Sequence, residues 1–90
     1  LQSSIQGELE TSLAAYQACR RKEATAAALA SEAATAAETT RRMVEGGEIS
    51  PLELARRRVE ESAAKVALLA AQLEAQAAAG ALEDAMQAPL

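Results

Sequence analysis

Few residues of this chain could do chemistry. It has no His and a single Cys, Cys19, so neither a Cys/His nucleophilic pair nor a transition-metal site of His and Cys ligands can be assembled. Adjacent carboxylates occur at Glu60-Glu61 and Glu83-Asp84, but neighbouring residues on a helix point to different sides, so neither pair suits acid–base catalysis. We therefore expect no enzymatic activity, no cofactor and no metal.

Two basic runs, Arg20-Arg21-Lys22 and Arg56-Arg57-Arg58, could in principle bind nucleic acid. The formal net charge is -4 and Tyr16 is the only aromatic residue, so the chain has neither an excess of positive charge nor rings for base stacking. We expect solvated basic faces paired with nearby Glu, and no nucleic-acid partner. The pair Gly46-Gly47 is too short for a phosphate loop. Tyr16 is expected at a helix interface with its hydroxyl at the edge.

The composition indicates which elements carry these residues. Hydrophobic residues make up 50% of the 90 positions and charged residues 24%, with Ala and Leu supplying most of the apolar side chains. Such a composition is typical of long helices and coiled coils. The longest strictly apolar run, Val66 to Ala71, is far shorter than the roughly 20 residues of a membrane helix, so we expect no membrane-spanning segment. Residues 1–9 show no signal-peptide pattern.

Strong turn signals occur at one place, near the middle of the chain. Gly46-Gly47 can end a helix through the left-handed conformation. Ser50 is a helix N-cap and Pro51 suits the first helical position. Glu53, three residues after the cap, completes a capping box. A helix therefore ends before this segment and another begins after it.

Weaker signals extend this interpretation to both ends. Ile49 and Leu54 form a hydrophobic staple around the cap, Ser3 with Gln6 is a weaker capping box upstream, and Pro89 marks an end. A connection this short forces two long helices to lie antiparallel. The predicted fold is all-α, a long antiparallel two-helix coiled-coil hairpin that self-associates. Its predicted parts are a helix over about 4–45, a turn over 46–50 and a helix over about 51–87, within one hairpin domain of 1–90.

Each predicted helix carries apolar or small residues at heptad spacing. The second helix has two such series on different faces. The first consists of Leu52, Val59, Val66, Leu73 and Gly80, with Ala55, Ala63, Ala70 and Ala77 between them. The second consists of Leu54, Leu68 and Leu82 with Ala64, Ala71, Ala75, Ala78 and Ala85.

The first helix repeats this logic. One series is Ile5, Ser12, Cys19, Ala26, Ala33 and Thr40, and it alternates with Leu9, Tyr16, Glu23, Ala30, Ala37 and Val44. A two-helix hairpin covers one seam per helix, and we expect each helix to carry more apolar surface than this contact hides, so the second apolar face implies further helices alongside. We expect the isolated hairpin to self-associate, for example into a four-helix bundle. The alternative is a stripe whose alanines simply remain exposed.

The residues from Val44 to Leu54, followed by heptad alanines and by Leu82, Ala85 and Met86, resemble the repeat of the TolC-like outer-membrane efflux proteins. Leu13 to Tyr16 lies where that family has an Ala-Tyr motif. The resemblance implies a periplasmic hairpin in the α-barrel wall of a Gram-negative outer-membrane channel, trimeric when complete. It also implies that the tip docks a periplasmic adaptor protein. The residues assigned to this tip are Val44, Gly46, Gly47, Ile49, Ser50 and Leu54.

The sequence departs from the family pattern at four positions, Val44, Arg57, Glu61 and Gln87, and it has one hairpin and no membrane strands. The resemblance therefore implies an excised periplasmic piece or a shortened relative.

The chain is also similar to the α-hairpin of periplasmic membrane-fusion adaptor proteins. Ile49-Ser50, Glu53-Leu54 and the return step Met86 to Pro89 fit that pattern, whereas Thr39 stands at the position of the adaptor's tip Arg and Met43 at that of its Leu. A third interpretation is a soluble coiled-coil scaffold with no transport role. A docking tip should lose partner binding when Gly47 and Ser50 are replaced, whereas a mere connector should tolerate the change.

Overall fold

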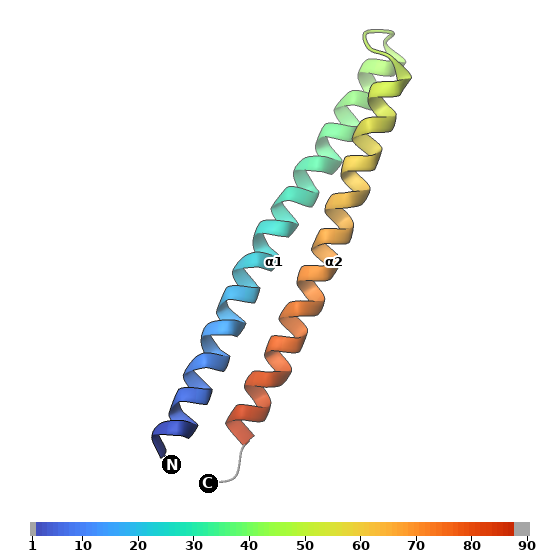
Figure 1. The fold of residues 1–90 in the computed structure, drawn as a ribbon. Coiled ribbons are helices and arrows are strands. Elements are labelled where there is room, and N and C mark those ends of the chain that lie inside the picture. Colours follow the sequence, from blue (N-terminus) through green and yellow to red (C-terminus); the bar gives the residue numbers. More distant parts are fainter. Residues whose placement is uncertain (1, 88–90) are drawn as a thin grey trace.

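The computed structural model describes residues 2–87, and the side chains of residues 6–87. It contains two long helices, α1 (Gln2–Glu45) and α2 (Pro51–Gln87), which lie side by side and run in opposite directions (Figure 1). The molecule is a rod with extents of 69 × 13 × 13 Å. The predicted all-α antiparallel hairpin is therefore confirmed.

The helix bounds agree with the turn signals and differ at the beginning of the chain. α1 ends at Glu45 and α2 begins at Pro51, where the sequence places these boundaries. α1 begins at Gln2, so Ser3 lies inside the helix and the predicted cap at Ser3 is wrong. Pro89, predicted to mark an end, lies outside the described residues.

The end of α1 is closed by a Schellman motif. Gly47 has a φ of 75°, the left-handed conformation that glycine adopts without steric cost. The Glu48 N–H donates to the Met43 carbonyl over 2.9 Å, and the Gly47 N–H donates to the Val44 carbonyl over 3.0 Å. These two bonds satisfy carbonyls that the last turn would otherwise leave free, and they direct the chain back toward α2.

The start of α2 is capped by a serine, as predicted, but the capping box is incomplete. Ser50 Oγ accepts a hydrogen bond from the Leu52 N–H over 3.2 Å. The Glu53 carboxylate does not reach back to the cap and lies instead 3.8 Å from Arg56 Nη1 and 3.7 Å from Arg57 Nε. A charge interaction with two arginines has replaced the reciprocal half of the box, so that half of the prediction is wrong.

The seam of α1 is the one that its heptad pattern predicts. From Ser12 onward, every member of the two alternating series is buried or half-buried. Leu9 is 37% exposed, and the side chain of Ile5 lies outside the described residues. Ala37 is fully buried, and Ala30 is 9% exposed.

On α2 the second of the two predicted series faces α1. From Ala64 onward its members alternate at spacings of four and three residues, and all members of the series are buried or half-buried. The full inner seam of α2 is Leu54, Arg57, Glu61, Ala64, Leu68, Ala71, Ala75, Ala78, Leu82 and Ala85. The buried apolar residues of the described chain are all alanines, and their small side chains let the two helix backbones approach closely.

Candidate functional site

The most unusual surface of the molecule lies on the outer side of α2. Four large aliphatic residues at heptad spacing are solvent-exposed there, and Leu69 beside them is 58% exposed. The sequence predicts the four as seam residues. Their exposed fractions are 71% for Leu52, 70% for Val59, 67% for Val66 and 59% for Leu73. We call these four residues the outer stripe. They do not pack against α1, so the hairpin alone leaves this predicted seam uncovered.

The outer stripe lies almost opposite the inner seam. With 3.6 residues per turn, Leu52 is displaced by about 200° from Leu54 and by about 140° from Arg57, which averages to roughly 170°. The stripe runs for about 30 Å along the helix axis, because Leu52 and Leu73 are separated by six turns. α2 therefore presents one apolar line to α1 and a second line to the opposite side.

A shallow groove between the helices extends the apolar surface from α2 toward α1. Leu29 of α1 is 55% exposed beside it, and the ion pair of Lys22 and Glu74 lies at one end. The remaining lining residues are Thr25, Ala26, Ala67, Ala70 and Ala71. The heptad patterns do not include Leu29. A large apolar residue directly before the seam residue Ala30 is the signal that could have identified it as part of the groove.

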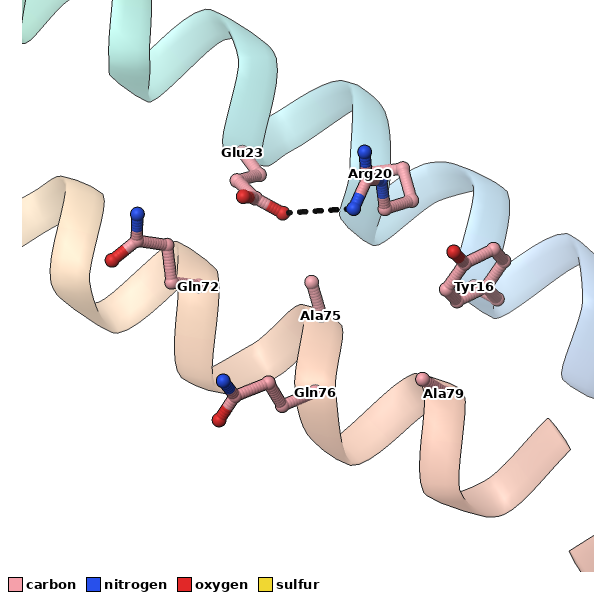
Figure 2. A pocket seen from close by; sticks show the side chains of 7 residues that line it. All are labelled: Tyr16, Arg20, Glu23, Gln72, Ala75, Gln76 and Ala79. Carbon is pink, nitrogen blue, oxygen red and sulfur yellow. Dashed lines mark ion pairs between the residues drawn. The ribbon is translucent and has the colours of Figure 1, made fainter. Parts of the chain in front are cut away.

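A second pocket between the helices is polar. Figure 2 shows the Arg20 and Glu23 side chains of α1 above Ala75, with the Tyr16 ring to one side. Arg20 Nη1 lies 3.7 Å from Glu23 Oε1. Gln72, Gln76 and Ala79 of α2 complete the lining. Tyr16 is half-buried, as expected. The pocket contains one carboxylate, which lies beside Arg20, and the Tyr16 hydroxyl, so its geometry offers a polar contact surface.

A cluster of charged residues lies near the tip, and its ion pairs stay within each helix. Arg41 Nη2 lies 2.6 Å from Glu38 Oε1, and Arg41 also pairs with Glu45. Hydrogen bonding from Arg41 lowers the pKa of Glu38 to about 2, and the same bond raises the pKa of Arg41. Ion pairs of this kind fix the local charge pattern without tying the two helices together.

A comparable network lies on α2. Arg58 Nη1 is 3.2 Å from Glu61 Oε1, and Lys65 Nζ is 3.4 Å from Glu61 Oε2. The hydrogen bond from Arg58 lowers the pKa of the Glu61 carboxyl. Arg57 belongs to the inner seam, and its Nε is a buried atom without a hydrogen-bond partner. The basic run of α2 is thus held by neighbouring carboxylates, which agrees with the expected paired face.

The predicted tip residues divide into two groups. Val44, Ile49 and Leu54 are half-buried and support the turn, whereas the exposed residues are Gly46, Gly47 and Ser50. Met43, which matches the tip Leu of the adaptor pattern but is not among the six predicted tip residues, is 40% exposed. The solvent-facing tip therefore consists of small and polar residues between Met43 on α1 and Leu52 on α2.

Residues 2–87 contain no group of three or more potential metal ligands among Cys, Asp and Glu. Neither α1 nor α2, as described, has the length and apolar character to cross a bilayer. No protein-family model, curated protein or solved structure matches this chain.

Proposed function

We propose that this chain is a wall element of a helical tube, a hairpin that stands beside others to enclose a conduit across the periplasm in an outer-membrane efflux channel. The observation that carries the proposal is the outer stripe, four exposed aliphatic residues at heptad spacing on the side of α2 that faces away from α1. Exposed apolar surface of this regularity is typical of a face that another helix covers.

The angle between the two apolar lines favours a row of helices over a compact bundle. In a square four-helix bundle each helix contacts neighbours at about 90° to one another. In a wide ring each helix has neighbours on nearly opposite sides. The separation of roughly 170° on α2 suits the row or the wide ring. For the free hairpin we therefore expect a flat arrangement of helices in place of the compact four-helix bundle.

The resemblance to TolC-like channels suggests which tube the hairpin helps to form and which protein its tip contacts. In this proposal three protomers build the complete wall, and the tip between Met43 and Leu52 contacts a periplasmic adaptor protein. The Schellman motif at Gly47 and the Ser50 cap support the tip role, because they hold a short turn in one conformation and leave apolar side chains exposed on both sides of it.

Binding to a purified adaptor protein of a tripartite efflux pump tests the proposal. The adaptor is immobilised and the hairpin titrated, with the Met43→Glu variant as the tip change and Leu29→Glu as a matched control far from the tip. Both residues are partly exposed, so circular dichroism should show unchanged helicity in both variants. We expect Met43→Glu to weaken binding by roughly tenfold or more and Leu29→Glu to have little effect.

The same assay separates the alternative functions. A second arm of the assay uses a purified TolC-like channel, because Ile49-Ser50 and Glu53-Leu54 fit the adaptor pattern. If the hairpin belongs to an adaptor, this channel will bind it and the immobilised adaptor will not. A scaffold without a transport role should bind neither protein. Equal binding of Met43→Glu and the unaltered hairpin would contradict the assigned tip.

A further inference from the structure

We infer that the outer stripe of the free chain is covered by a second copy of this chain, with α2 packed antiparallel against α2. The inference uses the same surface as the proposed function, but it does not depend on a role in transport. The antiparallel pair places the two tips at opposite ends, so it is a state of the free chain, distinct from the proposed wall, in which all tips lie at one end. Its consequence is a flat layer of four helices in which the two α2 helices are central and the two α1 helices are outermost.

The choice of α2 as the partner helix follows from what α1 exposes. The large exposed hydrophobic residues of α1 within residues 6–87 are Leu9, Leu13, Leu29 and Met43. Leu9 belongs to the inner seam, and each of the others is adjacent in sequence to a seam residue, so they lie at the edge of the hairpin's own contact. The outward side of α1 carries Ala, Ser, Thr and charged residues instead. A matching aliphatic ridge is therefore found on another α2.

The net charges of the two halves of α2 favour the antiparallel orientation. Residues 51–66 carry four cations and three carboxylates, a net charge of +1, whereas residues 67–87 carry three carboxylates and no cation, a net charge of -3. An antiparallel pair places the weakly basic half of each helix beside the acidic half of the other, and a parallel pair places the two acidic halves together. Such complementarity selects orientation more than it adds affinity. The residues are Arg56, Arg57, Arg58, Lys65, Glu53, Glu60 and Glu61 in the first half, and Glu74, Glu83 and Asp84 in the second.

The spacing of the stripe sets the register of the pair. Gly80 continues the heptad series of the stripe, which makes Val66 the central member of five. With the twofold axis at Val66, Val59 lies opposite Leu73 of the second copy and Leu52 lies opposite Gly80. A Cβ built on Gly80 meets nothing within 4 Å, so the surface there is open to the larger Leu side chain.

The size of the contact predicts a weak dimer. A stripe of about 40 Å by 10 Å from Leu52 to Gly80 covers roughly 400 Å² on each copy. Standard specific interfaces bury about 800 Å² per partner. The pair should therefore form in a concentration-dependent way and exchange readily, which leaves the stripe available to other hairpins.

Disulfide trapping tests both the partner and the orientation. In a Cys19→Ser background, Val59→Cys and Leu73→Cys variants are prepared separately, checked for helicity and oxidised alone or as a mixture. The antiparallel pair predicts roughly tenfold more mixed 59–73 disulfide than 59–59 disulfide, because the two 59 positions are about 20 Å apart in this arrangement.

The outcomes that would overturn the inference are distinct. Efficient 59–59 disulfide formation would show a parallel pair and refute the orientation. Absence of all three possible products at millimolar concentration would refute the dimer. Neither outcome bears on adaptor binding through the tip, which the adaptor-binding assay tests separately. High salt is expected to reduce the excess of mixed disulfide, since it screens the charges that select the orientation.

Discussion

Lys22 Nζ of α1 lies 3.0 Å from Glu74 Oε2 of α2, and within residues 6–87 this is the one ion pair that joins the two helices. The residues are 52 positions apart and equally distant in sequence from Glu48 at the turn. The hydrogen bond to Glu74 raises the pKa of Lys22. The pair therefore reports the register of the two helices well away from the turn. Because both side chains are largely exposed, the pair contributes little to stability.

The Glu38 carboxyl should make the hairpin sensitive to acid. Its pKa falls from 4.5 to about 2 in the folded chain, mainly because Arg41 donates a hydrogen bond to it. A lowered folded pKa stabilises the fold above pH 4.5, and this contribution is lost as the pH falls from 4.5 toward 2. We expect the urea midpoint to decline over that window and Glu38→Gln to flatten the decline. NMR titration of the Glu38 carboxyl carbon in Arg41→Ala should show a pKa closer to 4.5; an unchanged pKa would contradict the assigned cause.

The two glycines of the turn should respond differently to alanine. Gly47 has a φ of 75°, where a Cβ is strained, so Gly47→Ala should lower the free energy of unfolding by about 1 kcal/mol or more. A Cβ on Gly46 would meet the Arg42 carbonyl oxygen at 3.5 Å, an ordinary contact, so Gly46→Ala should be close to neutral. Urea unfolding of both variants provides the measurement. Equal effects would argue against the Schellman motif.

The alanine seam should not tolerate larger residues. Ala37 is fully buried between the helices, so Ala37→Leu should force them apart and cost about 1–3 kcal/mol of unfolding free energy. Ala28, on the exposed side of the same helix, provides the matched control, and Ala28→Leu should have little effect. Thermal unfolding followed by circular dichroism compares them. A harmless Ala37→Leu would mean that the backbones are not closely packed at that position.

Gly80 lies inside α2 without a packing reason in the isolated hairpin. A Cβ there meets nothing within 4 Å, and alanine is the better helix former. Gly80→Ala should therefore raise the unfolding free energy by about 0.5–1 kcal/mol when measured at low concentration, where the chain is monomeric. Destabilisation under these conditions would indicate a distortion of the helix near Gly80.

The hairpin itself was predictable because local signals agree with one another. Gly47 and Ser50 mark the turn through backbone preferences that act over a few residues, and the heptad pattern of α1 from Ser12 to Val44 has no competing series. Ser3 misled because a serine marks a helix start only where the residue before it is not helical, and Gln2 already belongs to α1.

The arrangement of α2 was not predictable to the same extent. Two series, one containing Leu52 and the other Leu54, repeat every seven residues, and periodicity alone does not say which one faces α1. The strict alternation of three and four residues through Arg57 and Glu61 identifies the inner seam, but these charged residues obscure it in a search for apolar positions. The structure separates them by burial, since Ala71 and Ala75 of the second series are buried whereas Leu52 of the first is exposed.

The ion pairs between side chains were the least predictable feature of the fold. Lys22 and Glu74 are too far apart in the chain for a local rule, whereas Arg41 has possible carboxylate partners both within its own helix and across the turn. The structure selects the intrahelical pairs because residues three and four positions apart on a helix are already neighbours before the hairpin forms.

Sedimentation equilibrium tests the central claim most directly, namely that the outer stripe of α2 is an assembly surface. The unaltered chain should shift from monomer to dimer or larger species as its concentration rises. Val66→Glu should remain monomeric over the same range with unchanged helicity, and Ala28→Glu should behave like the unaltered chain. A fully helical chain that stays monomeric at millimolar concentration, or equal association by Val66→Glu, would contradict the account.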